Sequence, residues 1–298
     1  MTSPIGTPSR LERLKADTLL LLVAIIWGTA FVAQRVAALN MGLYAFNGLR
    51  FLLGALVLLP FSRINQQDAP SLGGRDTWGI ALAGLLLLGG ASLQQLGLHY
   101  TTASNAGFIT GLYVVFIPLI LLVSGQHRPP RVVWLAALCA AAGLYLLSTG
   151  GRFRLAPGDA LVLVSAVLWA SHVIWIGRLV GRLDVLPIAV GQYLVCGGLS
   201  LAVGLLSEGT VIPRSAAAWG AIGYTAVFSI GIGYTLQVVG QRVAPPADAA
   251  ILLSLEAVFA ALTGWLVLDE RLSAIQLVGC GLMLAGMLLA QVHQEKTG

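Results

Sequence analysis

Two ionisable residues, Glu256 and Arg50, lie near the middle of long apolar stretches of the sequence. In LLSLEAVFAALTGWLVLDERL, residues 252–272, Glu256 is the one charged residue between Leu253 and Leu268. A carboxylate or guanidinium at the centre of a bilayer costs about 2.5–3.5 kcal/mol on insertion scales, so each needs a partner or a wet cavity. Such groups can bind an opposite charge or exchange a proton. The alternative is a structural ion pair or hydrogen bond that holds helices together.

Asn47 lies three residues before Arg50, so the two side chains share one face of a helix. Together they could bind a carboxylate group, because a guanidinium and an amide both donate hydrogen bonds. The structural alternative is that Arg50 fixes its helix against a backbone carbonyl group. The sequence leaves both alternatives open.

Aromatic, amide and imidazole side chains occupy several other apolar stretches. The further candidates for a binding or coupling site are Trp27, Gln34, His99, Tyr113, Trp169, His172, Tyr234 and Gln237. Trp and Tyr rings stack on other rings and attract ammonium groups, each contact contributing about 0.5–2 kcal/mol. The structural alternatives are packing aromatic residues, amide hydrogen bonds between helices, and histidines satisfied within the core.

Catalytic and nucleotide-binding patterns are missing from the sequence. There is no GxxxxGK[ST] phosphate loop, so this chain does not encode an ATP-driven pump. Serine, histidine and acidic residues are not paired at a diagnostic spacing. Cys139, Cys196 and Cys280 fall inside apolar stretches and match no metal-binding pattern. We therefore predict no catalytic residues, no metal and no cofactor.

The composition requires a lipid environment. Hydrophobic residues make up 57% of the 298 residues and charged residues only 10%, whereas a soluble domain carries about 25% charged residues. The 36 glycines are typical of closely packed membrane helices. We attribute the net charge of +5 to loop arginines on one side of the membrane, and not to nucleic-acid binding.

Ten apolar stretches are long enough to cross a bilayer, which takes roughly 20 residues. They lie near residues 17–35, 41–61, 77–98, 104–124, 132–149, 157–177, 186–206, 215–240, 246–267 and 273–292. The loops are short, so successive helices must be antiparallel. The stretch 215–240 is long for one span, and we expect it to tilt or to leave the bilayer. The prediction is an all-α polytopic membrane protein.

Lysine and arginine residues divide unequally between the two sets of predicted loops. One set contains Arg10, Arg13, Lys15, Arg63, Arg75, Arg128, Arg131, Arg178, Arg182, Arg242 and Lys296. The other set contains Arg35, Arg152, Arg154, Arg214 and Arg271. Loops rich in Lys and Arg face the cytoplasm. We therefore predict that the terminal segments 1–16 and 293–298 are both cytoplasmic.

The two halves of the chain, residues 17–151 and 157–292, are related in sequence. LQQLGLHYTTASNAGFITGLYVVF, from Leu93, aligns without gaps with LQVVGQRVAPPADAAILLSLEAVF, from Leu236, at an offset of 143 residues. Identical pairs include Gln94/Gln237, Gly97/Gly240 and, at an offset of 142, Trp27/Trp169. Five spans are an odd number, so the second half enters the membrane from the opposite side. Such inverted repeats are typical of secondary transporters with a site at the midplane.

Tyr113 and Glu256 occupy equivalent positions in the two halves, and each lies two residues after a small residue, Gly111 or Ser254. Small residues at this spacing favour close helix packing. Two residues along a continuous helix rotate the side chain by about 200°. If the small residues pack against other helices, Tyr113 and Glu256 point the other way, towards a cavity or another helix. The paired Trp27 and Trp169 would flank the same central cavity.

The chain resembles the drug/metabolite transporter superfamily, EamA type, over nearly its whole length. The resemblance rests on the five-plus-five spans and on the stretches GLRFLLGALVLLPF, LLSLEAVFAALTGWLVLDERL and GLMLAGMLLA. It implies ten helices around a central cavity. At this length the chain is similar to bacterial inner-membrane exporters of amino acids and other metabolites, and the direction of transport rests on this resemblance alone.

We expect a secondary transporter that exports a small zwitterion or weak cation with an apolar or aromatic part, most simply an amino acid. Glu256 would attract an amine or exchange protons, and Arg50 would attract a carboxylate. The alternatives are efflux of cationic compounds, sugar-phosphate exchange, and, from another class, an intramembrane enzyme or structural subunit. Sugar phosphates need several cations in the path, and Arg50 is the one at mid-depth. The expected partners are a small-molecule substrate, protons and the bilayer, and we expect a monomer, with a dimer as the alternative.

Reporter fusions to each predicted loop and to both termini should report ten spans, with the two termini in the cytoplasm. The reason is the unequal distribution of Lys and Arg together with the repeat. A C-terminus on the outer side, or an odd number of spans, would contradict the inverted repeat and the transport function inferred from it.

Overall fold

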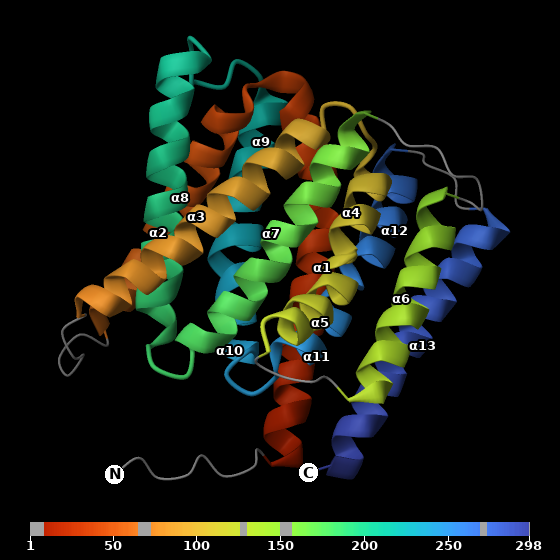
Figure 1. Ribbon diagram of the computed structural model, residues 1–298. Coiled ribbons are helices and arrows are strands. Elements are labelled where there is room, and N and C mark those ends of the chain that lie inside the picture. The colour runs from red at the N-terminus through yellow and green to blue at the C-terminus, as the bar shows by residue number, and fades with distance from the viewer. Residues whose placement is uncertain (1–8, 65–72, 126–129, 150–156, 269–272, 298) are drawn as a thin grey trace.

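The computed structural model describes residues 9–64, 73–125, 130–149, 157–268 and 273–297. These residues form helices joined by turns and short connections (Figure 1). Four of the arginines on which the predicted orientation depends, Arg128, Arg152, Arg154 and Arg271, lie outside the described residues. The sidedness of the membrane therefore stays a prediction.

Ten helical segments follow one another along the described chain. Seven are single helices: α1 (Arg10–Asn40), α2 (Leu43–Ile64), α3 (Gly74–Gly97), α6 (Arg131–Thr149), α7 (Pro157–Leu179), α8 (Val185–Ser207) and α13 (Ala274–Thr297). Three are interrupted: α4 (Ala103–Gly111) with α5 (Tyr113–Val123); α9 (Ala216–Tyr224) with the π-helix η2 (Thr225–Tyr234) and α10 (Thr235–Gly240); and α11 (Pro246–Leu253) with α12 (Glu256–Leu268). Each predicted span corresponds to one segment, so the all-α polytopic architecture is confirmed.

By length and composition, eight of these segments can cross a membrane. The other two, α6 and α13, have shorter apolar parts among the described residues, Arg131–Gly143 and Ala274–Met283. The helix α1 begins at Arg10, inside the predicted terminal segment 1–16, because Ser9 and Glu12 cap it reciprocally: the Glu12 N–H donates to Ser9 Oγ (3.2 Å) and the Ser9 N–H to Glu12 Oε2 (2.7 Å). At the other end, α13 continues to Thr297. The start of α1 and the end of α13 lie at the same end of the bundle (Figure 1).

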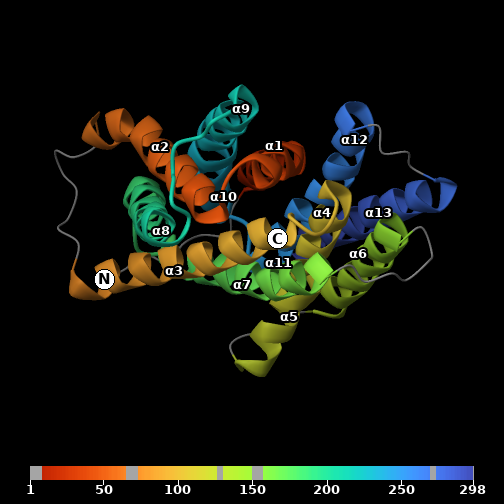
Figure 2. The same ribbon diagram turned by 90° about the horizontal axis from the view of Figure 1, so that it is seen from above.

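The first helix of each half packs into the other half. The helix α1 lies against α10, α11 and α12, whereas α7 lies against α3, α4 and α5 (Figure 2). Glycines make these contacts close: a Cβ on Gly97 of α3 would lie 2.5 Å from Val162 Cγ2, and a Cβ on Gly240 of α10 would lie 2.9 Å from Leu20 Cγ. Because Leu20 and Val162 are equivalent positions at the offset of 142, the same contact is made twice.

The last helices of the two halves, α6 and α13, pair along one side of the bundle (Figure 1). A Cβ on Gly143 would lie 2.5 Å from the backbone oxygen of Gly279, and a Cβ on Gly286 would lie 2.8 Å from the backbone oxygen of Ala136. These contacts are again equivalent at the offset of 143. Repetition of the same packing in both halves is what an inverted repeat produces.

Two segments that the sequence predicts as continuous helices are broken at equivalent positions. The Leu112 N–H donates to the Ile109 oxygen (3.2 Å), and the Leu255 N–H donates to the Leu252 oxygen (3.2 Å), so each break is a tight 3₁₀-like turn. Ser254 Oγ donates to the backbone oxygen of Ile251 (2.8 Å), a bond that weakens a helix locally. The prediction assumed a continuous helix, which these turns interrupt, but Tyr113 and Glu256 both line the cavity, as it expected.

Replacing Gly143 with alanine should destabilise the protein by about 1–3 kcal/mol, because the new Cβ meets the backbone of α13, which cannot move aside as a side chain can. The matched control is Gly198→Ala: Gly198 also lies within a helix but has no atom within 4 Å of its Cβ position. Unfolding midpoints in detergent would compare the two variants. Equal midpoints would contradict the close α6–α13 contact.

Candidate functional site

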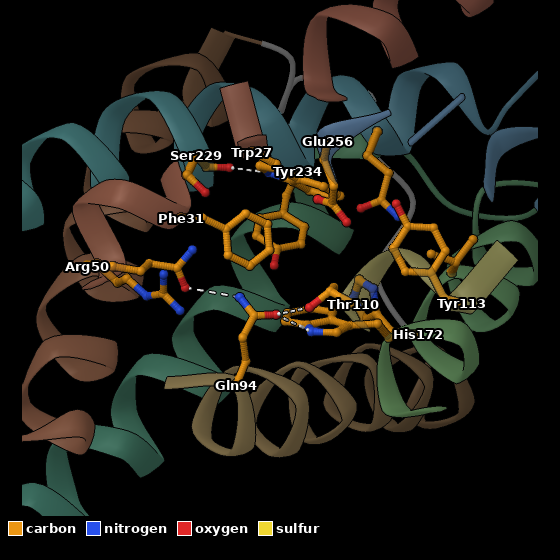
Figure 3. A pocket seen from close by; sticks show the side chains of 14 residues that line it. Trp27, Phe31, Arg50, Gln94, Thr110, Tyr113, His172, Ser229, Tyr234 and Glu256 are labelled. Carbon is orange, nitrogen blue, oxygen red and sulfur yellow. Dashed lines mark hydrogen bonds between the residues drawn. The ribbon is translucent and has the colours of Figure 1, made fainter. Parts of the chain in front are cut away.

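A cavity lies between the two halves, and both halves contribute to its wall (Figure 3). Its lining residues are Trp27, Phe31 and Gln34 of α1, Arg50 of α2, Gln94 of α3, Thr110 of α4, Tyr113 of α5, Trp169, His172 and Val173 of α7, Ser229 and Tyr234 of η2, Gln237 of α10, and Glu256 of α12. Of these side chains, Arg50 and Glu256 alone are of types that carry a full charge at neutral pH. The cavity wall is otherwise aromatic, amide and hydroxyl.

The structure brings together all but two of the site residues that the sequence predicts. His99 is exposed beyond the end of α3, where its ring meets Tyr100 edge-on at 5.7 Å. Asn47 is fully buried but does not line the cavity. Among the described residues, neither amide atom of Asn47 has a hydrogen-bond partner. The predicted pairing of Asn47 with Arg50 on one ligand is therefore not supported by the cavity wall.

Five lining residues are absent from the predicted set: Phe31, Gln94, Thr110, Val173 and Ser229. Phe31 and Val173 lie one helical turn from Trp27 and Trp169, so their spacing could have indicated them. Gln94 is the repeat equivalent of the candidate Gln237, and it both bonds to other helices and lines the cavity. Thr110 and Ser229 carry no sequence pattern, because small hydroxyl residues are common in membrane helices.

Tyr234 is the centre of an aromatic cluster in the cavity. Its ring centroid lies 4.6 Å from that of Trp27, 6.0 Å from that of Trp169 and 6.1 Å from that of His172. Tyr234 ends the π-helix η2, a geometry that is uncommon and often found at functional sites. The wide turn is held from outside: Trp27 Nε1 donates to the Ser229 oxygen (3.2 Å) and Tyr193 Oη donates to the Ile230 oxygen (3.0 Å).

The two cavity tryptophans make equivalent contacts across the halves. A Cβ on Gly233 would lie 2.6 Å from Trp27 Nε1, and a Cβ on Gly90 would lie 3.1 Å from Trp169 Cε2. Gly90 and Gly233 are equivalent at the offset of 143. Each indole is thus pressed against a glycine of the other half, which fixes both rings at the cavity wall.

Gln94 connects three helices through hydrogen bonds. Its Oε1 accepts from Trp169 Nε1 (2.8 Å) and from Thr110 Oγ1 (3.3 Å), and its Nε2 donates to Gln34 Oε1 (3.1 Å). Its repeat equivalent Gln237 forms a more local bond, from Nε2 to Gln241 Oε1 (3.0 Å). Polar side chains that bond across helices fix their packing in a bilayer, so Gln94 fixes more helices directly than Gln237 does.

Glu256 and Tyr113 are the first residues of α12 and α5, directly after the two equivalent helix breaks. Gly28 of α1 lets the start of α12 approach, since a Cβ there would lie 2.6 Å from the Glu256 backbone oxygen. Both side chains line the cavity. Within the described part of the chain, neither Glu256 Oε1 nor Tyr113 Oη has a hydrogen-bond partner. A carboxylate at a helix start also faces the positive end of the helix dipole.

Arg50 lies on the opposite side of the cavity from Glu256, with Phe31 and Tyr234 between them in view (Figure 3). Its guanidinium carbon lies 4.7 Å from the ring centroid of Phe46 and 5.0 Å from that of Phe51. These cation–π contacts partly compensate the buried charge. Among the described residues no carboxylate forms an ion pair with Arg50, so a hydrogen-bond acceptor from outside the chain can bind there.

His172 contributes a neutral polar edge to the cavity. His172 Nε2 lies 2.7 Å from Gln192 Oε1, and because an amide oxygen can only accept, the imidazole hydrogen is on Nε2. Nδ1 is then an acceptor, and it has no partner within the described residues.

These features define the class of the protein. Discontinuous helices that meet at a polar cavity between two related halves are the construction of a secondary membrane transporter. The chain belongs to the EamA-like transporter family, whose pattern matches residues 14–149 and again residues 156–291. It is a multi-pass membrane transporter and not an enzyme.

Several relatives share this architecture. An uncharacterised transporter of Archaeoglobus fulgidus is 32% identical over 97% of this chain and 89% of its own length. The threonine/homoserine exporter RhtA of Escherichia coli K12 is 27% identical over 91% of this chain and 88% of its own. The uncharacterised inner membrane transporter YedA of the same strain is 26% identical over 89% and 87%. One solved crystal structure superposes with a TM-score of 0.76 over 95% of this chain and 98% of that chain, at 19% identity, which shows the fold alone.

Gln94→Leu should lower stability by about 1–3 kcal/mol, because it removes three hydrogen bonds and leaves Trp169 Nε1 without its acceptor. The repeat-related control Gln237→Leu removes one bond to Gln241 and should cost about 1 kcal/mol or less. Unfolding midpoints of both variants in one detergent would measure the difference. A larger loss for Gln237→Leu would contradict the unequal role of the two amides.

Proposed function

We propose that this transporter exports small amino acids with apolar or aromatic side chains through the cavity between its halves. One observation carries the proposal: the Glu256 carboxylate is buried at the wall of an aromatic cavity without a cationic partner among the described residues. An uncompensated carboxylate in such surroundings attracts an ammonium group or a proton. The rings of Trp27, Trp169 and Tyr234 supply apolar faces for the rest of the molecule.

One relative supports amino acids as the substrate class. RhtA is named as an exporter of threonine and homoserine, both of which are small amino acids. Export, and location in the bacterial inner membrane, are inferred from the names of RhtA and YedA. We extend both to this chain, with its two termini in the cytoplasm, the repeats at residues 17–151 and 157–292, and a monomer as the working unit.

The two helix breaks support an alternating-access mechanism. Tyr113 and Glu256 follow equivalent breaks, one in each half, so a change in the tilt of one half against the other would move both across the cavity. Glu256 would hold either a proton or the ammonium group of the substrate. It would take up a proton while open to one side of the membrane and release it to solvent on the other side, where the ammonium group then binds. Proton coupling is thus part of the proposal, with Glu256 as the coupling residue.

Export of cationic compounds shares the attraction to Glu256 and is the second candidate. Sugar-phosphate exchange is disfavoured, because Arg50 is the one lysine or arginine that lines the cavity among the described residues. A dianionic phosphate needs more than one cation to offset its loss of hydration.

Competition in proteoliposomes tests the substrate class. Counterflow of labelled phenylalanine should be inhibited by tryptophan, methionine and threonine, and not by a phosphorylated sugar. If the four amino acids neither move nor compete while a phosphorylated sugar does, the proposed function is wrong. Inhibition by simple aromatic amines alone would favour efflux of cationic compounds.

Glu256→Gln keeps the size of the side chain and removes its charge. We expect counterflow to fall by at least about tenfold at every pH, because one charge-assisted hydrogen bond contributes about 1.5–3 kcal/mol. The matched control is Glu12→Gln, an exposed change that preserves the helix cap. If the Glu256→Gln variant inserts normally and transports at the wild-type rate, Glu256 is structural.

A further inference from the structure

The two charged residues of the cavity replace tyrosines of the opposite half. Arg50 of α2 aligns with Tyr193 of α8, and Glu256 of α12 aligns with Tyr113 of α5, both at the offset of 143. The backbone packing of the halves is equivalent, as the paired glycine contacts show. The two walls of the cavity therefore have nearly the same backbone packing but opposite charges, positive in the first half and negative in the second.

Neither charge is neutralised by the described part of the protein. Arg50 is 3% exposed and Glu256 is 2% exposed. In the described ranges, Arg50 Nε and Glu256 Oε1 have no hydrogen-bond partner, and no ion pair joins the two side chains although both line one cavity. Tyr234 lines the same cavity and lies between them in view in Figure 3. A buried charge without an ion-pair partner is unfavourable, and a group of opposite charge on a ligand would offset that cost at each wall.

We propose that Arg50 and Glu256 form a two-point site for a zwitterion, which binds in one orientation. The carboxylate of the substrate lies on Arg50 and its ammonium group lies on Glu256, beside Tyr113. The inference rests on the proposed function. It adds that the protein binds both charged groups of the amino acid, the carboxylate by the first half and the ammonium group by the second. The apolar side chain then lies against Phe31 and Tyr234.

A two-point site rejects molecules that carry only one of the charges. An amine without a carboxylate leaves Arg50 unpaired in a dehydrated site, and an acid without an amine leaves Glu256 unpaired. The loss is larger than the missing attraction, because the unpaired protein group keeps its own desolvation cost. Arg50 therefore makes the site prefer amino acids over simple amines, whereas Glu256 attracts both.

Binding of phenylalanine, phenethylamine and 3-phenylpropionate to the purified full-length protein in detergent tests the proposal. These three ligands share the ring and differ only in their charges. The wild type should bind phenylalanine about 10- to 100-fold more tightly than either analogue. Arg50→Gln should weaken phenylalanine and phenylpropionate by that factor and leave phenethylamine unchanged or improved. Glu256→Gln should weaken phenylalanine and phenethylamine and spare phenylpropionate.

The crossed pattern separates a binding role from a structural one. If Arg50→Gln weakens all three ligands equally, Arg50 only holds the fold and the two-point site is wrong, while binding of phenylalanine still supports the proposed function. If the wild type binds none of the three, the proposed function and this inference both fall. Arg50→Lys, which keeps the charge without the planar fork, should restore part of the preference for phenylalanine over phenethylamine if Arg50→Gln does not fold. The matched control Arg35→Gln, outside the cavity, should leave that preference unchanged.

Discussion

Water is absent from the core of a bilayer, and the rest of this structure depends on that constraint. Every backbone N–H and C=O group within the membrane must find a partner inside the chain, so the described residues form helices. Where a helix breaks, at Leu112 and Leu255, the backbone bonds onward through tight turns. Where a π-helix widens, Trp27 and Tyr193 donate to its carbonyl groups. A charged side chain cannot be satisfied as readily, and Arg50 and Glu256, which form no ion pair among the described residues, therefore indicate a site.

The repeat explains how one cavity is built from two halves. Each first helix, α1 or α7, crosses into the other half and brings a tryptophan against a glycine there, Trp27 on Gly233 and Trp169 on Gly90. Neither half could form the wall alone, because each indole is positioned by the partner half. These close glycine contacts lie between the halves, so they fix the two halves against each other, and a shift of one half against the other has to change them.

Function requires that the symmetry be incomplete. Equivalent backbones carry different side chains at the positions that matter: Arg50 against Tyr193, Glu256 against Tyr113, and a π-helix in the second half where the first has the regular helix α3. Gln94 joins α1, α4 and α7, whereas Gln237 bonds within its own segment. The two walls of the cavity therefore differ in charge, positive at Arg50 and negative at Glu256.

The sequence by itself determined the class of fold, because hydrophobic length and short loops are local properties: all ten segments, the repeat and most of the cavity residues follow from them. It also indicated Glu256 and Arg50, since an isolated charged residue in an apolar stretch can be recognised without the tertiary structure. Only the tertiary structure decided which polar residues share a cavity. Asn47 is one helical turn from Arg50 yet does not line the cavity, and His99 lies outside it, whereas Thr110 and Ser229 join the wall. The breaks before Tyr113 and Glu256 and the π-helix before Tyr234 change the rotation of the side chains that follow. Those changes depend on contacts between segments that are distant in the sequence, so the helical periodicity of the sequence cannot predict them.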